Sequence, residues 1–322
     1  MDYSVINAAI SDIEFFLEHY DKYKLFDNKV MERLLIALLG YYLAFGPDIF
    51  KKFEIVLDGI YIYHCIDEQD CIDKKQEFCP YSIVEDANPS TMWDYQYDEK
   101  NRVKGAIPRV IYGEQDLVSD SLNLVHELSH VLEGVNAQIL AEDNEKVLVK
   151  HGFGQYEVIK PTSRFKAEGM GMTELITIII ENHVFKELLK LDYTKIDNII
   201  VKKFLKLLKK YKDSNVILKS YSYMSSVFKD LIDNNYFFEL IKKYYYENDM
   251  ELMIEEYNGL DSRLDLKKLA SYAEKVFEED FDQIMYYAEP IQKQLNILND
   301  VTGFVPDNRI IVLVWWYFED LL

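Results

Sequence analysis

The sequence predicts an α+β fold, with a mixed portion over residues 1–184 followed by a mainly helical portion over residues 185–322. Apolar residues recur every three to four positions from residue 3 to about 56, and again over most of the chain after residue 185. That is the period of a helix with one buried side. Short segments between these regions are rich in β-branched and aromatic residues, which favours strands of a small mixed sheet. With 49% hydrophobic residues in 322, the chain can form a sizeable core.

The elements of the N-terminal portion follow from local signals. Pro47 interrupts the first helical region. Residues 58–66, DGIYIYHCI, then favour a strand, and the polar, proline-containing residues 67–90 favour a loop. The aromatic and β-branched segments 91–97 and 107–113 are joined by a polar, turn-like stretch, so we expect them to form a hairpin.

Two further helices are expected on either side of a short β segment. The first extends from about Asp120 to Gly134, where glycine is a suitable stop. The β segment covers residues 145–160, EKVLVKHGFGQYEVIK, and the second helix begins near Met172. No internal repeat or low-complexity tract interrupts this order.

The charge of the chain argues against several classes of partner. Lys and Arg number 36 against 56 Asp and Glu, a formal net charge of −20. A surface of that sign repels nucleic acid and anionic membranes. The apolar runs are too short to cross a bilayer, and the N-terminus shows no signal-peptide pattern. We therefore expect a cytoplasmic protein that binds neither nucleic acid nor membrane, while the oligomeric state is not indicated.

Cysteine usage agrees with a reducing compartment. Cys65, Cys71 and Cys79 are odd in number and crowded into one segment, unlike the framework of a disulfide-rich secreted protein. We expect three free thiols. His64 adds a fourth metal-capable side chain, but the cysteine spacings are not those of a C-x-x-C zinc site, so a structural metal is not expected there.

The stretch NLVHELSHVLEG, residues 123–134, contains an H-E-x-x-H motif. Residues four apart lie on one face of a helix, so His126 and His130 can direct their imidazoles at a single ion. Glu127 is placed to act on a metal-activated water without binding the metal. The alternative is a half-buried helix with one hydrogen-bonded and one solvated histidine.

Zinc needs a further protein ligand, and the residues after His130 exclude one class of zinc peptidase. The class that continues H-x-x-G-x-x-H would need Gly and His where this chain has Glu133 and Asn136. Downstream, GMGMTELITIIIENH opens an apolar helix with the pair Thr173 and Glu174.

On the H-E-x-x-H motif and this Thr-Glu pair, the chain resembles the gluzincin metallopeptidases, and in particular zincin-like proteins of Gram-positive bacteria. A weaker similarity is VIYGEQD, residues 110–116, which looks like a strand end in thermolysin-like enzymes. The resemblance covers about residues 91–182. It implies a zincin-like fold in which His126, His130 and Glu174 bind Zn²⁺ and Glu127 is the general base.

The resemblance also implies that the strand nearest the cleft binds an extended peptide. Residues 91–97, TMWDYQY, are the expected edge strand, which would pair with the main chain of a peptide or protein substrate. The predicted function is therefore zinc-dependent hydrolysis of peptide bonds. A non-catalytic protein with a structural zinc, or a regulatory protease-like factor acting on a single partner, remains the alternative.

The chain departs from the gluzincin pattern at two points. Thermolysin-type enzymes place an Asp four residues after the third ligand, where this chain has Ile178. Glu181, seven residues after Glu174, is the candidate to orient a zinc-bound histidine instead, with ordinary exposure as the alternative. No His follows His183, so a tyrosine would have to stabilise the oxyanion; Tyr223, beside Tyr221, is the candidate, with core packing as the alternative.

Three other residues near the motif have alternative roles. If Glu174 is not the third ligand, Glu133 is the next candidate, because it shares the face of the two motif histidines. His151 and His183 are expected to have packing or surface roles rather than catalytic ones.

Overall fold

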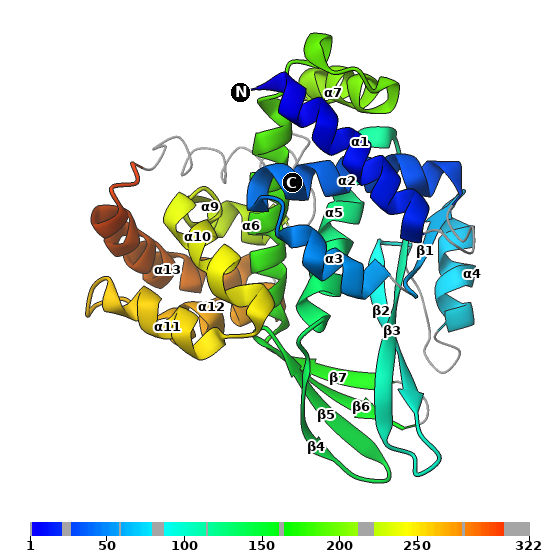
Figure 1. Cartoon of the computed structure of the whole chain (residues 1–322). Coiled ribbons are helices and arrows are strands. Elements are labelled where there is room, and N and C mark those ends of the chain that lie inside the picture. Colours follow the sequence, from blue (N-terminus) through cyan, green and yellow to red (C-terminus); the bar gives the residue numbers. More distant parts are fainter. Residues whose placement is uncertain are drawn as a thin grey trace. The chain divides into compact units, whose positions relative to one another are not determined.

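The structure, a computed structural model, describes residues 2–20, 27–57, 59–78, 87–113, 115–160, 164–211, 222–278 and 281–305. It is an α+β protein, as the sequence predicts, but its described strands form two small sheets rather than the expected one (Figure 1). Its contacts divide the chain into two units. The first comprises Met1–His151, Tyr156–Ala167 and His183–Ile217, and the second comprises Gly152–Gln155, Glu168–Asn182 and Leu218–Leu322. The units are interleaved along the chain, whereas the sequence analysis placed one boundary at residue 184.

Three helices begin the first unit: α1 (Tyr3–Tyr20), α2 (Asn28–Phe45) and α3 (Ile49–Leu57). The Asp27 side chain caps α2 by accepting a hydrogen bond from the Val30 amide at 2.7 Å. Gly46, with φ +86°, ends the helix in a conformation that glycine adopts without strain. The expected helical region and its interruption near Pro47 are therefore confirmed.

The hairpin predicted from residues 91–113 is present. Strands β2 (Ser90–Tyr97) and β3 (Val103–Gly113) pair antiparallel, and β1 (Tyr61–Cys65) pairs parallel to β3 on its other side. The strand order β1-β3-β2 makes β2 an edge strand of this sheet.

The expected loop over residues 67–90 is wrong in its first half, because α4 (Glu68–Phe78) occupies it. The Asp67 carboxylate accepts a hydrogen bond from the Asp70 amide at 2.9 Å, which caps the helix. Only Cys71 and Lys75 of α4 are buried, so its apolar face is too narrow to show in the sequence. Residues 79–86 lie outside the described part of the chain.

A disulfide joins Cys65, at the end of β1, to Cys71 in α4, with 5.3 Å between their Cα atoms. The expectation of free thiols is wrong for this pair. The turn between β1 and α4 brings side chains six positions apart within bonding distance, which spacing along the chain does not reveal. Cys79, the third cysteine, lies outside the described residues.

The motif helix, α5 (Leu117–Gly134), begins three residues earlier than expected. The Asp116 carboxylate accepts hydrogen bonds from the amides of Val118 and Ser119 and so defines its start. Helix α2 packs against α5, where the buried Tyr41 hydroxyl donates to the Val125 carbonyl at 2.8 Å. This contact holds the helix one residue before the motif.

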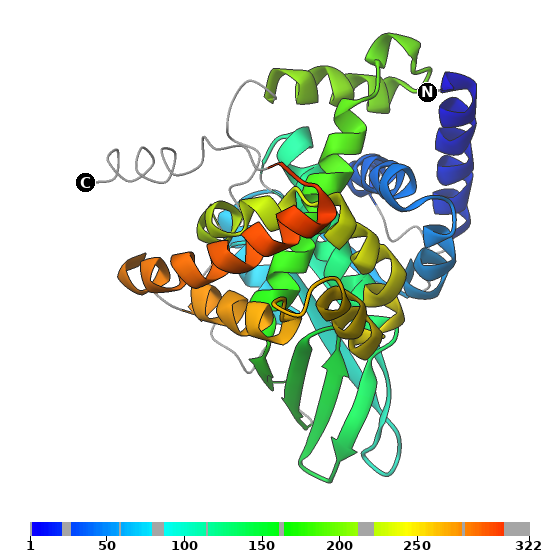
Figure 2. The same ribbon diagram turned by 90° about the vertical axis from the view of Figure 1, so that its left-hand side faces the viewer.

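A second sheet has the order β4-β5-β6-β7, formed by β4 (Gln138–Glu142), β5 (Lys146–His151), β6 (Gly154–Ile159) and β7 (Arg164–Glu168). It includes the β segment expected at 145–160. The buried Lys160 ammonium donates to the Glu142 carboxylate and to the Asn101 carbonyl, each at 2.6 Å. These bonds fix the tip of the β2–β3 hairpin to the second sheet, beside which it lies in Figures 1 and 2.

Helix α6 (Met170–Leu189) starts near the expected Met172. At its N-terminus the Glu274 carboxylate accepts hydrogen bonds from the amides of Gly169 and Gly171, at 2.9 and 2.6 Å. A β-carbon at Gly171 would overlap the Ala273 carbonyl. Glycine is therefore required for the close approach of α12 to the start of α6.

Every described element after α6 is helical, as expected. These are α7 (Ile199–Tyr211), α8 (Ser222–Val227), α9 (Lys229–Ile232), α10 (Asn235–Tyr244), α11 (Met250–Gly259), α12 (Leu266–Glu278) and α13 (Phe281–Thr302), with two short 3₁₀ turns, Tyr193–Lys195 and Tyr245–Glu247. In the second unit α12 packs against α13 (Figure 2). Within the described part of the chain, no helix is long and apolar enough to cross a membrane.

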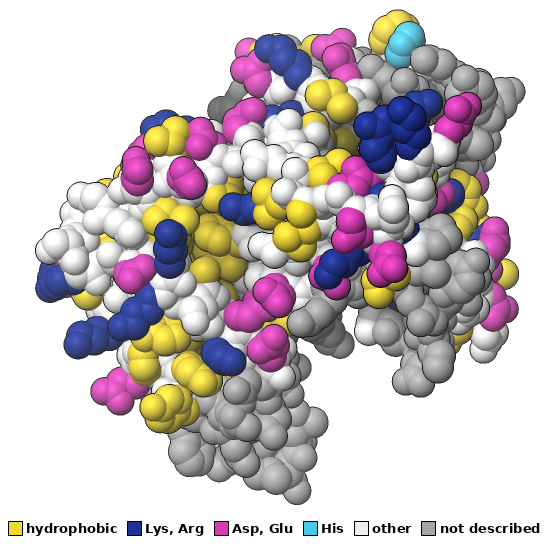
Figure 3. All heavy atoms as spheres, turned by 90° about the horizontal axis from the view of Figure 1, so that it is seen from below, with side chains coloured by type: hydrophobic (Ala, Val, Ile, Leu, Met, Phe, Trp, Pro, Cys, Tyr) yellow, Lys and Arg dark blue, Asp and Glu magenta, His cyan; other side chains and the backbone are white. Residues whose placement is uncertain are grey.

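Charged side chains of both signs are intermixed on the face shown in Figure 3, and hydrophobic side chains form small groups there. The described residues of this face show no extended basic area. This distribution agrees with the net charge of −20.

Candidate metal centre

The two motif histidines lie one turn apart on α5. Their ring centroids are 5.2 Å apart and their planes meet at 72°. His126 is 7% exposed, and the His130 side chain is 14% exposed. Because the helix is held by Tyr41 on one side and capped at Asp116, the imidazoles project from a fixed backbone.

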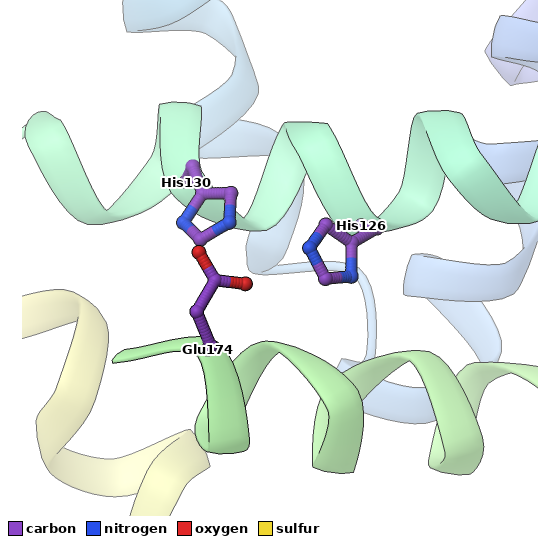
Figure 4. Close-up of side chains that lie close together, drawn as sticks. All are labelled: His126, His130 and Glu174. Carbon is purple, nitrogen blue, oxygen red and sulfur yellow. The ribbon is translucent and has the colours of Figure 1, made fainter. Parts of the chain in front are cut away.

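Glu174, in the first turns of α6, completes a group of possible ligands (Figure 4). One nitrogen from each of His126 and His130 and one carboxylate oxygen of Glu174 all lie within 4.8 Å of one another. Two ligands about 2.1 Å from the same tetrahedral ion are about 3.4 Å apart. Side-chain movements of about an ångström would therefore bring the three atoms to zinc-binding distances. Two imidazoles and a carboxylate are also a donor set that Zn²⁺ accepts.

Glu127 is held by the edge strand. The Thr91 hydroxyl, at the start of β2, is 2.8 Å from the Glu127 carboxylate and 3.0 Å from the Glu127 carbonyl. Residues 91–97 therefore lie beside the motif, as the edge-strand prediction requires, and their position at the sheet edge is confirmed. Whether they bind a peptide stays a prediction.

Glu133, the alternative third ligand, lies between two histidines. Its carboxylate oxygens are 3.7 Å from His130 Nδ1 and 3.5 Å from His151 Nδ1. Burial alone raises the pKa of Glu133, but the charges of the neighbouring His151 and His130 outweigh it, so the pKa is below its usual range. Glu133 is thus an anion positioned to orient the His130 ring.

From the sequence, this orienting role was expected of Glu181, whereas Glu133 was expected only as an alternative ligand and His151 only in a packing or surface role. The spacing of three between His130 and Glu133 was a usable signal, since such residues are neighbours on a helix. No comparable signal linked His151, whose ring stacks on Tyr156 at 4.2 Å, to the motif.

The other residues singled out from the sequence have varied positions. Glu181 is 5% exposed on α6, and so is not an ordinary surface residue; it does not belong to the three-residue ligand group. His183 is buried, as a packing role requires. The Tyr223 side chain and all of Tyr221 lie outside the described residues.

His64 belongs to a buried network at the start of the motif helix. Its Nε2 is 2.8 Å from an Asp120 oxygen that also accepts hydrogen bonds from the Arg33 guanidinium at 3.1 and 3.2 Å. Asp120 is fully buried, and its second oxygen accepts from the Gln115 amide. The network joins α2, β1 and α5, and the sequence analysis did not find it because its members are far apart along the chain.

No protein family, curated protein or solved structure matches the chain. The fold and the site therefore define it as an α+β protein with a largely buried His-His-Glu group beside a further glutamate.

Proposed function

We propose that the protein is a zinc-dependent peptidase of the gluzincin type. The observation that carries the proposal is the convergence of His126, His130 and Glu174, with Glu127 beside them and tied to an edge strand. The H-E-x-x-H motif supplies two ligands and the base, whereas Glu174 and the strand come from other parts of the sequence, so the motif alone does not account for the whole arrangement. The assignment of the α+β fold to the zincin-like type is part of this proposal.

His126, His130 and Glu174 would hold the ion. Zinc bound there would supply a Lewis acid that polarises the peptide carbonyl and lowers the pKa of water. Glu127 accepts a proton from the attacking water and returns it to the departing amine. The Thr91 hydroxyl keeps the Glu127 carboxylate in one orientation during both transfers.

The edge strand β2 provides the peptide-binding surface. Its outer edge has no strand partner among the described residues, so an extended substrate could pair with it as a further strand. A peptide paired with β2 would run past Thr91 and present a carbonyl next to Glu127.

Glu133 lies between His130 and His151 and can fix the orientation of the His130 ring. The Glu133 carboxylate beside Nδ1 of His130 favours the tautomer that leaves Nε2 free to bind a metal. Oxyanion stabilisation by Tyr223 and cytoplasmic location stay predictions from sequence, and the disulfide counts against a reducing compartment.

Two variants test metal binding and chemistry separately. Glu127→Gln should keep near-stoichiometric zinc, measured by atomic emission, while hydrolysis of a quenched-fluorescence peptide library falls by at least about 10²-fold. Glu174→Ala should lose zinc at low free metal, because a ligand is gone.

Other outcomes redirect or reject the proposal. Full zinc occupancy in Glu174→Ala would show that the third ligand is elsewhere, with Glu133 the next candidate. Stoichiometric zinc without cleavage of any library peptide would favour a non-catalytic or single-partner protein. A wild-type protein without zinc affinity would reject the metal site.

A further inference from the structure

A cavity of about 330 Å³ lies within the first unit, along the hairpin, and none of the three proposed ligands lines it. Its walls include residues 103–108 of β3, Trp93 and Tyr95 of β2, and Val149 and His151 of β5. Tyr95 is half-buried in this wall, and burial raises its pKa to about 12. The volume is at the small end of known ligand pockets and suits one side chain rather than a folded domain.

The cavity follows the edge of β3. Successive residues of a strand point to opposite faces, so a cavity on one face would touch every second residue. This cavity touches all six residues from 103 to 108. It is therefore bounded by the side of the strand, where main-chain groups are exposed, and reaches from there onto one face.

That edge of β3 has no strand partner. β1 pairs only with residues 109–113, and β2 pairs with the opposite edge. Among the described residues, no other strand joins this sheet, although the Val103 amide donates to the Glu142 carboxylate. Residues 104–108 thus form a short open edge that ends where β1 begins.

The face next to this edge is aromatic and rigid. Trp93 packs so closely over Gly134 that a β-carbon there would overlap its ring. The His151 ring lies 6.4 Å from Trp93 and stacks on Tyr156. The cavity can therefore accept an apolar group without movement of these side chains.

We propose that an extended segment of a partner protein pairs with residues 104–108 of β3 and inserts one large apolar side chain into the cavity, against Trp93 and His151. Main-chain hydrogen bonds would supply affinity, and the cavity would select the side chain. This surface is on the opposite edge of the hairpin from the proposed substrate strand β2. The proposal does not depend on zinc or on hydrolysis.

The test uses the full-length protein and fluorescein-labelled peptides, acetyl-Lys-Thr-Val-Xaa-Val-Thr-Lys-amide, in fluorescence polarisation. With Phe, Leu or Trp at Xaa, binding should be at least about tenfold tighter than with Asp, because the cavity rejects a charge. Peptide binding should persist in EDTA and with the Glu127→Gln variant. A protein that neither binds zinc nor hydrolyses peptides could therefore still bind at this edge, so the two proposals are tested independently.

Variants locate the bound peptide. Ala106 pairs with Tyr95 and so shares the cavity face, whereas Lys100 is exposed in the hairpin turn and does not line the cavity. Ala106→Trp should reduce affinity at least about tenfold, while Lys100→Trp should not change it. Ile139→Lys, at an exposed wall position, provides a second variant if Ala106→Trp does not fold.

Amide exchange followed by NMR completes the test. Bound peptide should slow exchange at those amides of residues 104–107 that face the open edge, Pro108 having no amide hydrogen. Equal affinity for Phe and Asp peptides, wild-type binding by both folded cavity variants, or protection confined to β2 would each overturn the proposal.

Discussion

Thr91 shows how a single hydroxyl can connect a strand to a catalytic motif. Its Oγ is within hydrogen-bonding distance of both the carboxylate and the carbonyl of Glu127. In a mainly buried site, a carboxylate without such a partner would sample more orientations. The proposed base therefore depends on a residue 36 positions away in the sequence.

Replacing this hydroxyl should affect the rate and not the metal. Thr91→Val keeps the side-chain shape but removes the hydrogen bond, so kcat should fall about tenfold while zinc content is unchanged. Thr91→Ser retains the hydroxyl and should restore most of the rate. Peptidase assays with zinc analysis check both; a fully active Thr91→Val would show that Thr91 does not position Glu127.

At the scale of elements, the contact between α2 and α5 determines where the motif helix lies. Tyr41 is fully buried, and its hydroxyl bonds to the Val125 carbonyl and lies 2.6 Å from the Ser129 hydroxyl. Val125 and Ser129 lie on either side of the first three positions of the motif, residues 126–128.

Tyr41→Phe should lower the free energy of unfolding by about 1 kcal/mol, because buried polar groups lose a partner. Tyr42→Phe is the matched control on the same helix. Its ring lies against Phe50, 6.2 Å between centroids, and this packing survives the change. Urea unfolding followed by circular dichroism measures the difference; equal midpoints for the two variants would contradict the assigned role.

The start of α6 depends on the absence of a side chain at Gly171. Gly171→Ala places a methyl group on the Ala273 carbonyl and should destabilise the protein by about 1–3 kcal/mol. Gly259→Ala, in α11 with open space around the new β-carbon, should be neutral or stabilising by up to about 1 kcal/mol. Thermal unfolding of the two variants tests the contrast. No loss of stability in Gly171→Ala would show that α12 can shift to make room for the methyl group.

At the scale of the whole molecule, the disulfide changes the expected chemistry of the chain. With Cys65 and Cys71 bonded, titration under denaturing, non-reducing conditions should find one thiol, and reduction should raise the count to three. Mass spectrometry of an unreduced tryptic digest would identify the bond, because both cysteines lie in one peptide, residues 53–74, which gains two hydrogens on reduction. A count of three thiols before reduction would show that the bond does not form in solution and would restore the expectation of a reducing compartment.

Much of the fold could be predicted from local patterns. The early helices, the hairpin at 91–113 and the motif helix all appear where periodicity, strand-forming residues and caps indicate them. Helix α4 was missed because only Cys71 and Lys75 of its eleven residues are buried. A helix with so narrow a buried face has almost no hydrophobic period to detect.

The sequence by itself determined that His126 and His130 share one face of a helix, because a spacing of four is set by helix geometry alone. It also identified Glu174 as the third member, by resemblance. Only the tertiary structure decided that Thr91 holds Glu127, that Glu133 lies between His130 and His151, and that β3 keeps an open edge beside a cavity. These features join residues brought together by packing between elements, and sequence spacing carries no information about such contacts.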